Sequence, residues 1–483
     1  MIEIEELCIQ YSDRSHPAID RLTETIAGGE VIVLTGPSGC GKSTLCRALA
    51  GFIPEMIPAQ VSGEITVDGE SVWTADPARV ATRLGLIQQD PDAQICTLNV
   101  WQEVAFGPEN LCLPPSEVAA RVEQCLAFVG ITHLAERTTT TLSGGEKQRL
   151  AIASILAMAP ETILLDEPSA NLDPEGAQAV FNLLRELRDR EGRTLIVVEH
   201  RLAPLLPLSP RVLVMNKGGI VTRRATRQHE DLVALGLRAN WLRADWDLDL
   251  PAPGKRGEVA PLRVEDLTFG YDGTPFLDRL SITVEPGEIL GIIGPNGGGK
   301  TTLLRLIAGL EEPSAGRIIR PRESVLGYLF QHPHQQIFER TVRGEFAIEG
   351  AISDESLRRS LDAANLSGLG SAAPLSLSLG EQRRLALATT LVRDPDLLLL
   401  DEPFIGQDRA NVAWIIAKIL AARAKGAVTL LVSHDIPLVN SLCDRLLYLG
   451  AESIIGDPRT VSARLQTIGK DAFTPGYWEG ETT

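Results

Sequence analysis

Alternating apolar–polar segments and short apolar runs occur in the same order in both halves of the chain. Residues 2–11 and 19–26 alternate, and residues 31–35 are nearly all apolar. The second half repeats this with alternation at 263–271 and 277–284 and an apolar run at 289–293. Alternation predicts half-buried strands, whereas a short apolar run predicts a strand buried on both faces. Each half is therefore predicted to begin with two half-buried strands and one core strand.

Further apolar runs predict more core strands, at residues 162–165, 195–198, 397–400 and 429–432. A glycine-rich segment follows each first core strand, and a helix is predicted directly after it, at residues 43–50 in the first half. Strands separated by helices are typical of an α/β fold with a parallel sheet.

Three motifs repeat along the chain. GPSGCGKST (36–44) recurs as GPNGGGKTT (294–302), LSGGEKQR (142–149) as LSLGEQRR (377–384), and ILLDEP (163–168) as LLLDEP (398–403). Ser143 and Ser378 are 235 positions apart, and so are Asp166 and Asp401. A repeat of this length indicates two whole domains rather than a solenoid of small units.

We expect a first domain at residues 1–235, a linker at 236–261, a second domain at 262–465 and a C-terminal tail at 466–483. Residues 240–261 are rich in Asp, Pro, Gly and Trp and lack periodicity, which is typical of a linker. Trp241 and Trp246 are candidates to pack back onto a domain.

Composition narrows the possible functions. The 483 residues carry a net charge of −17, which weighs against sequence-independent binding of nucleic acid. No apolar run approaches the roughly 18–20 residues of a membrane span, and the first residues are acidic where a signal peptide would be basic. Seven cysteines without a C-x-x-C pair argue against a zinc site or a disulfide framework. We expect a chain that neither crosses a membrane nor is exported.

The glycine-rich loops have the G-x-x-x-x-G-K-[ST] spacing that lets backbone N–H groups surround a β-phosphate. Lys42 and Lys300 would reach the β- and γ-phosphate oxygens, and the hydroxyls of Ser43 and Thr301 would hold Mg²⁺. The predicted nucleotide-binding residues of the loops are Gly36, Pro37, Ser38, Gly39, Cys40, Gly41, Lys42, Ser43, Thr44, Gly294, Pro295, Asn296, Gly297, Gly298, Gly299, Lys300, Thr301 and Thr302. Cys40 is either a thiol whose alkylation inhibits the protein or a small filler residue.

An acidic pair ends one apolar strand in each half. Asp166 and Asp401 suit a role at Mg²⁺, and the adjacent Glu167 and Glu402 are placed to orient or deprotonate an attacking water. The alternative is a pair of carboxylates that caps the next helix.

With these motifs in place, the chain resembles the ABC-type ATPases over nearly its whole length. The resemblance implies two tandem P-loop domains, each with a mainly parallel core sheet, an antiparallel β subdomain and a helical subdomain. It also implies head-to-tail pairing, in which one half's signature contacts ATP on the other half's loop. The signature residues are Ser143, Gly144, Gly145, Glu146, Ser378, Gly380 and Glu381.

The resemblance assigns further roles by position. Tyr11 and Tyr271 match the aromatic residue that stacks on adenine, although each could instead pack on its own domain. Gln89 and Gln331 match the glutamine that contacts Mg²⁺ and water. His200 and His434 match the histidine that touches the γ-phosphate. Asp173 and Asp408 match an aspartate that crosses the dimer interface.

The two implied sites differ at one signature position. Leu379 stands where the first half has Gly144, so the site of Lys42 and Glu167 would face the altered signature. Leu restricts φ and could obstruct the backbone's approach to phosphate. We expect weaker, not abolished, chemistry at that site.

The glutamine region resembles one branch of this superfamily. QDPDAQI followed by VAFGPEN (104–110) is similar to the ATPases of energy-coupling-factor importers for vitamins or for cobalt and nickel. That resemblance implies an integral membrane coupling subunit, a small membrane substrate-binding subunit, and a place at the cytoplasmic face of the cell membrane. The alternatives are a tandem sugar-importer ATPase and a soluble ABC ATPase that acts in translation or DNA repair.

Overall fold

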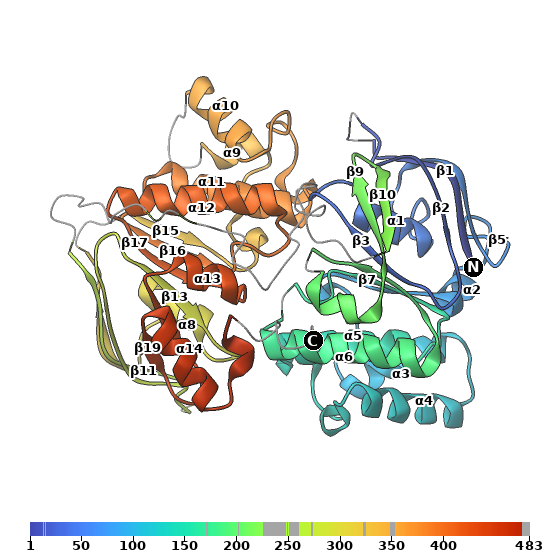
Figure 1. Ribbon diagram of the computed structural model, residues 1–483, viewed down its shortest axis with the longest axis horizontal. Helices are drawn as coiled ribbons and strands as arrows, with labels where there is room; N and C mark the ends of the chain where they lie inside the picture. The colour runs from blue at the N-terminus through green and yellow to red at the C-terminus, as the bar shows by residue number, and fades with distance from the viewer. Residues whose placement is uncertain are drawn as a thin grey trace. The chain divides into compact units, whose positions relative to one another are not determined.

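The computed structural model describes residues 1–12, 14, 16–170, 172–200, 202–225, 248, 250, 260–271, 274–321, 325–347 and 353–475. The chain divides into two compact units, residues 1–239 and 240–483, and each is described by itself (Figure 1). The tryptophans of the predicted linker, Trp241 and Trp246, lie outside the described residues. Leu248 and Leu250 pack against the core of the second unit.

The first unit contains a four-stranded antiparallel sheet and a six-stranded sheet. The first sheet has the order β2-β1-β4-β5 and the second β10-β9-β3-β8-β7-β6, in which only the β9–β10 pair is antiparallel. The strands are β1 (Ile2–Gln10), β2 (Ile19–Ile26), β3 (Val31–Thr35), β4 (Gln60–Val67), β5 (Glu70–Ser71), β6 (Leu84–Ile87), β7 (Thr162–Asp166), β8 (Thr194–Val198), β9 (Arg211–Asn216) and β10 (Gly219–Ala225). The helices are α1 (Lys42–Leu49), α2 (Pro77–Arg83), α3 (Val100–Asn110), α4 (Pro115–Phe128), α5 (Gly144–Leu156) and α6 (Pro174–Glu191).

The second unit repeats this arrangement with a three-stranded and a six-stranded sheet. Their strand orders are β12-β11-β14 and β15-β16-β17-β13-β18-β19. The strands are β11 (Leu262–Phe269), β12 (Leu277–Val284), β13 (Ile289–Ile293), β14 (Ala315–Ile319), β15 (Leu326–Leu329), β16 (Leu397–Asp401), β17 (Val428–Val432), β18 (Arg445–Tyr448) and β19 (Ile454–Gly456). The helices are α8 (Lys300–Ala308), α9 (Val342–Glu345), α10 (Asp354–Ala363), α11 (Leu379–Val392), α12 (Arg409–Ala424), α13 (Ile436–Leu442) and α14 (Pro458–Thr467).

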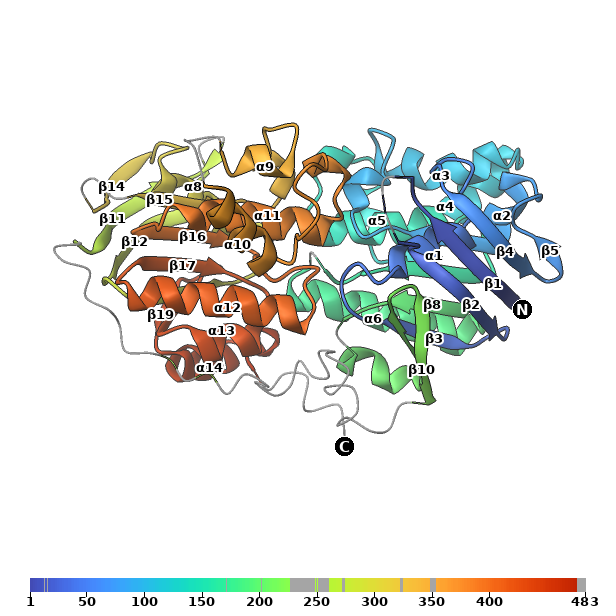
Figure 2. The same cartoon turned by 90° about the horizontal axis from the view of Figure 1, so that it is seen from above.

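The parallel strands bring the motifs to one edge of each sheet. Every residue of β3, β7 and β8 is buried, and Asp166 at the end of β7 lies beside Val198 at the end of β8. Asp401 and Val432 are paired in the same way in the second unit. Because parallel strands end at the same edge, the glycine-rich loop, the acidic pair and the histidine after β8 or β17 are gathered there. Figure 2 shows α12 running along β17 on one face of the second sheet.

The predicted strands are confirmed, with the same bounds at 19–26, 31–35, 277–284 and 289–293 and small shifts elsewhere. The predicted helix at 43–50 is observed as α1, one residue earlier. The stretch from the glycine-rich loop to the acidic pair is longer in the first unit, where β5 and α2 lie between β4 and β6. In the second unit β14 is followed directly by β15 in the described part of the chain.

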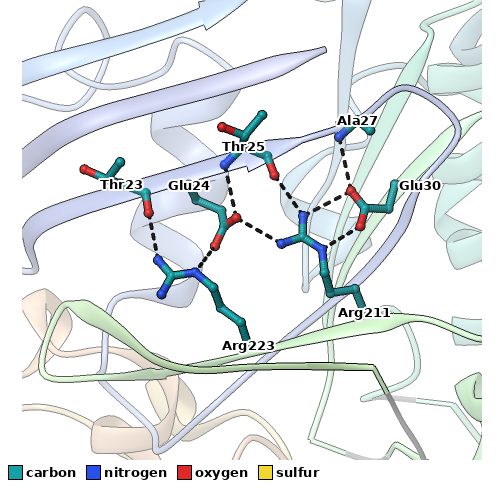
Figure 3. Close-up of polar contacts among 7 residues, drawn as sticks. All are labelled: Thr23, Glu24, Thr25, Ala27, Glu30, Arg211 and Arg223. Carbon is teal, nitrogen blue, oxygen red and sulfur yellow. Dashed lines mark hydrogen bonds and ion pairs between the residues drawn. The ribbon is translucent and has the colours of Figure 1, made fainter.

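A group of ion pairs around the buried Glu24 ties the two sheets of the first unit together (Figure 3). Arg211 on β9 contacts Glu24 on β2 at 2.9 Å and Glu30 at 2.5 Å, and Arg223 on β10 contacts Glu24 at 2.7 Å. Burial opposes ionisation of Glu24, but the hydrogen bonds from both arginines lower its pKa. The second unit keeps a smaller version, in which Arg445 contacts Glu288 at 3.0 Å.

The second unit continues beyond residue 465. Helix α14 packs on β18 and β19, and Phe473 is buried with its ring 5.5 Å from that of Tyr448. No helix in the described part of the chain is both long and apolar enough to span a membrane.

Candidate active site

Each glycine-rich loop turns sharply between a strand and a helix. Gly36 and Gly294 have φ of 148° and 143°, a region that favours glycine. A Cβ atom at Gly36 would lie 2.1 Å from the Met215 carbonyl oxygen, and one at Gly294 would lie 2.1 Å from that of Leu449. The loops can therefore approach the neighbouring strand closely only because glycine stands at these positions.

The loop lysines begin the helices α1 and α8 and fold back over their own loops. Lys42 Nζ donates to the carbonyl oxygens of Gly36 and Pro37 at 2.9 and 3.0 Å. Lys300 Nζ donates to Gly294 and Pro295 at 2.9 and 2.8 Å. Both ammonium groups are buried at the centre of a loop whose helix N-terminus follows, which is an arrangement suited to bind phosphate.

The aspartates at the strand ends have the chemistry of a divalent-cation site. Thr301 Oγ1 donates to Asp401 Oδ2 at 2.7 Å, and Ser43 forms the equivalent bond to Asp166. The Oδ1 atom of each aspartate is buried and has no hydrogen-bond partner among the described residues. Burial raises the pKa of both carboxyls to about 6. A hydroxyl beside an unsatisfied buried carboxylate oxygen fits Mg²⁺, which prefers oxygen ligands.

The two glutamates are held in an unusual backbone conformation. Glu167 and Glu402 have φ of 49° and 52°, in the left-handed region that non-glycine residues rarely occupy. Their N–H groups donate to Val198 and Val432 at 3.0 Å, which extends the sheet hydrogen bonds by one residue. Such local strain is concentrated at functional sites, and here the backbone conformation sets the direction in which each glutamate side chain leaves the strand end.

In the first unit, the predicted glutamine and histidine both reach the glutamate. Gln89 Nε2 donates to Glu167 Oε2 at 2.8 Å, and His200 Nε2 lies 3.2 Å from Glu167 Oε1. The structure thus brings together three residues, of which the first, Gln89, and the last, His200, are more than 100 positions apart in the sequence.

In the second unit, the corresponding glutamate is held differently. His434 Nε2 lies 3.4 Å from Glu402 Oε1 and 3.1 Å from Asn296 Oδ1. Within the described residues, the Gln331 side chain forms no hydrogen bond to Glu402. Glu402 is buried, and burial together with the nearby Asp401 raises its pKa to about 8. The contacts of the glutamate carboxylate therefore differ between the two units.

The signature serines are helix caps. Ser143 and Ser378 are the N-caps of α5 and α11, and each forms a capping box with the glutamate three residues later. The helix N-termini beyond them leave backbone N–H groups available for an anion. The predicted interface aspartates, Asp173 and Asp408, cap α6 and α12 in their own units.

The expectation that Leu379 weakens the signature by restricting the backbone φ is wrong. Gly144 is not among the glycines with positive φ, and Leu379 is the first residue of α11, so the position is helical in both units. Leucine adopts this conformation without strain. Only the bulk of the Leu379 side chain remains as a difference from Gly144.

The two tyrosines lie in different surroundings. Tyr11 is half-buried against the core of the first unit, and its hydroxyl donates to Thr44 Oγ1 at 3.3 Å. Tyr271 is 52% exposed and packs edge-on against Phe269, with ring centroids 5.1 Å apart. The role of either ring at adenine stays a prediction.

Two buried glutamates, which the sequence motif contains but to which it assigns no role, shape the segment after each glutamine. Glu103 Oε2 accepts from the N–H groups of Cys96 and Thr97 at 3.1 and 2.8 Å. Glu345 Oε1 accepts from those of Phe338 and Glu339 at 2.7 and 2.6 Å. Both follow the motif glutamine by fourteen positions, so aligning the two halves would have identified them.

Comparison with known proteins agrees with this geometry. The sequence profile of the family described as ABC transporter matches residues 19–170 and 277–405. A protein of Methanosarcina acetivorans named as an ABC transporter ATP-binding protein is 32% identical, with 95% of this chain and 86% of the relative covered. One of Bacillus subtilis named for HMP/thiamine import is 33% identical, with 93% and 90% covered.

Solved structures similar to nearly the whole chain include the archaeal ribosome recycling factor aABCE1, determined with the ribosomal stalk protein aP1. It is 25% identical to this chain, with a TM-score of 0.64, and the match covers 96% of this chain and 92% of that one. Two family matches, near-complete relatives and a paired set of loops, acidic strand ends and signatures lead to one conclusion: the chain belongs to the ABC transporter family and is an ATP-binding ATPase with two cassettes in one polypeptide.

Proposed function

We propose that this chain energises a membrane importer for a small micronutrient, of the energy-coupling-factor type, and lies at the cytoplasmic face of the cell membrane. Its partners would be an integral membrane coupling subunit and a small membrane substrate-binding subunit. The relative named for HMP/thiamine import supports a vitamin-type cargo.

The observation that carries the proposal is the exposed apolar segment beside each glutamine. Leu98 and Phe106 follow Gln89 and are 73% and 48% exposed, and Phe338 follows Gln331 and is 76% exposed. Glu103 and Glu345 fix the backbone of these segments from the inside. Large apolar side chains held outward on a fixed backbone suit docking to a partner. Leu98 and Phe338 follow their glutamines by nine and seven positions, so a partner docked there would be linked to the nucleotide through the same segment of chain.

The chain's own residues account for the hydrolytic step. Lys42 and the N–H groups of its loop would bind the phosphates, and Glu167 would orient or deprotonate the attacking water. Gln89 and His200 hold the two oxygens of that carboxylate. Ser43, Asp166 and Gln89 would hold Mg²⁺, which when bound neutralises charge on the phosphate oxygens. The second unit offers Lys300, Glu402, His434, Thr301, Asp401 and Gln331 for the same roles.

We further propose that the two cassettes pair head to tail. The signature at Ser143 would then contact ATP held by Lys300, and the signature at Ser378 would contact ATP held by Lys42. ATP binding would close the pair and hydrolysis would reopen it, moving the docking segments and the membrane subunits with them.

A second function has one observation in its favour. The likeness to the ribosome recycling factor covers nearly the whole chain, so a soluble ABC ATPase that acts in translation is the main alternative. The two functions differ in what binds the exposed segments.

Affinity purification from the native cell distinguishes the two functions. The tagged chain, extracted in mild detergent, is expected to retain a polytopic membrane protein and at least one small membrane subunit. Replacing Phe106 and Phe338 with Asp should release both while ATP binding persists. Val221 is 54% exposed on β10, and Val221→Asp serves as the matched control that should release neither. Recovery with ribosomes and without membrane subunits would overturn the proposal.

A further inference from the structure

Helix α11 contains a buried arginine that the first unit lacks. Arg383 is 3% exposed, and its counterpart in the aligned motifs is Gln148. Arg383 Nη1 donates to the carbonyl oxygen of Ile405 at 2.7 Å, and Nη2 donates to that of Gln331 at 2.8 Å. One guanidinium thus bridges the segment of the motif glutamine and the segment between Glu402 and Asp408.

Neighbouring residues extend this bridge. Gln407 Nε2 donates to the carbonyl oxygen of Gly380 in the signature at 3.1 Å, and Arg384 Nη1 donates to Gln407 Oε1 at 3.3 Å. In the first unit Leu172 stands at the position of Gln407, and it cannot form these bonds. Within the residues described there, Gln148 Nε2 is buried without a hydrogen-bond partner.

The guanidinium restricts how these segments can move. Its donors lie in a rigid plane, so the two carbonyl oxygens are held at a fixed separation. Moving either segment alone would leave a buried charged donor unsatisfied, which is costly. The guanidinium therefore couples the Gln331 and Ile405 segments of the second unit, whereas the described residues of the matching segments in the first unit show no equivalent bridge.

We propose that Arg383 is a positioning residue of the second ATP site. It holds the Gln331 segment and the segment after Glu402 in one arrangement, so that both reach bound nucleotide together. This inference rests on the proposed function of Glu402 and Gln331 in hydrolysis.

The test uses the full chain with Glu167→Gln, so that turnover reports the second site. In this background Arg383→Gln, which installs the residue of the first unit, is expected to lower kcat about tenfold and to change the Kd for ATP less than about twofold. Arg383→Lys should give an intermediate kcat, because the ammonium keeps the charge but lacks the planar guanidinium that fixes the separation of the two carbonyl oxygens. Arg358→Gln, the same substitution at an exposed position of α10, is the matched control and should leave kcat unchanged.

A double-mutant cycle separates positioning from a general loss of structure. If Arg383 acts through the Gln331 segment, adding Arg383→Gln to Gln331→Ala should lower kcat less than twofold further. Independent, multiplicative losses would overturn the inference, and so would an unchanged kcat in folded Arg383→Gln. If Arg383→Gln does not fold, the Arg383→Lys cycle decides. A separate measurement tests the proposed function itself. If adding Glu402→Gln to the chain that carries Glu167→Gln leaves turnover intact, the proposed role of the second site is refuted.

Discussion

At the scale of single residues, we expect the buried Glu402 carboxyl to make the stability of the folded state depend on pH. Its pKa in the folded state, about 8, lies above its ordinary value of 4.5 because burial and Asp401 disfavour the charged form. The folded state therefore binds this proton more tightly than the unfolded state. The stabilisation of the folded state by the protonated Glu402 carboxyl is fully present below about pH 4.5 and is lost as pH rises towards 8.

Glu402→Gln removes this cost because glutamine stays neutral. In nucleotide-free, Mg²⁺-free protein, the variant should be more stable than the parent by on the order of a few kcal/mol at pH 8, and by little at pH 5. Thermal unfolding at the two pH values measures the difference. Glu109→Gln, at an exposed position of α3, is the control and should show no such dependence. A gain that is equal at both pH values would contradict the prediction.

Residue identities at the site could be predicted from the sequence, but their environments could not. The doubled motifs located both lysines, both acidic pairs and both histidines, since spacing alone fixes their place at a strand end. That Gln89 reaches Glu167 while Gln331 does not reach Glu402 depends on side-chain packing. Arg383, which takes the motif position of Gln148, donates to the backbone carbonyl oxygen of Gln331, and this contact too could not be predicted from spacing.

At the scale of elements, Glu103 holds a loop against a helix. It lies in α3, is buried, and accepts two backbone N–H groups and the hydroxyl of Thr97. Glu103→Ala leaves these donors without their partner, which should lower the free energy of unfolding by about 2 kcal/mol. Urea unfolding measures this loss, and Glu109→Ala on the same helix should cost much less. Equal losses would show that the helix, not the anchoring of the loop, was affected.

The elements differ in how well the sequence predicts them. Core strands such as β7 and β16 are continuous apolar runs bounded by polar residues, so the sequence alone predicts their first and last residues to within one position. Helix α14 was not predicted, because only Val461 and Leu465 are buried in it and such a sparse pattern is not distinctive. Its position depends on tertiary contacts with β18 and β19, which the local sequence of the helix does not reveal.

At the scale of the whole molecule, the duplication provides two sites that have diverged. The residues that we propose for hydrolysis are present in both cassettes, but Leu379 replaces the signature glycine only in the second. With head-to-tail pairing, the Leu379 side chain would stand beside ATP held by Lys42. Glu402→Gln should therefore reduce total turnover more than Glu167→Gln, and steady-state ATPase measurements on both variants test this ordering. Equal losses would remove the argument for divergence.

The same pairing makes a sharper prediction about Leu379 itself. With Glu402→Gln present, turnover reports the site of Lys42 alone. Because the position is helical and unstrained in both units, only side-chain bulk separates Leu379 from Gly144. Leu379→Gly should then raise kcat several-fold at this site, by letting the helix N-terminus approach phosphate closely, as an anion-binding helix end requires. Leu375→Gly, at a position 66% exposed just before the signature, is the control for added flexibility. An increase in both variants would point to flexibility, and no increase in Leu379→Gly would show that this signature does not serve the Lys42 site.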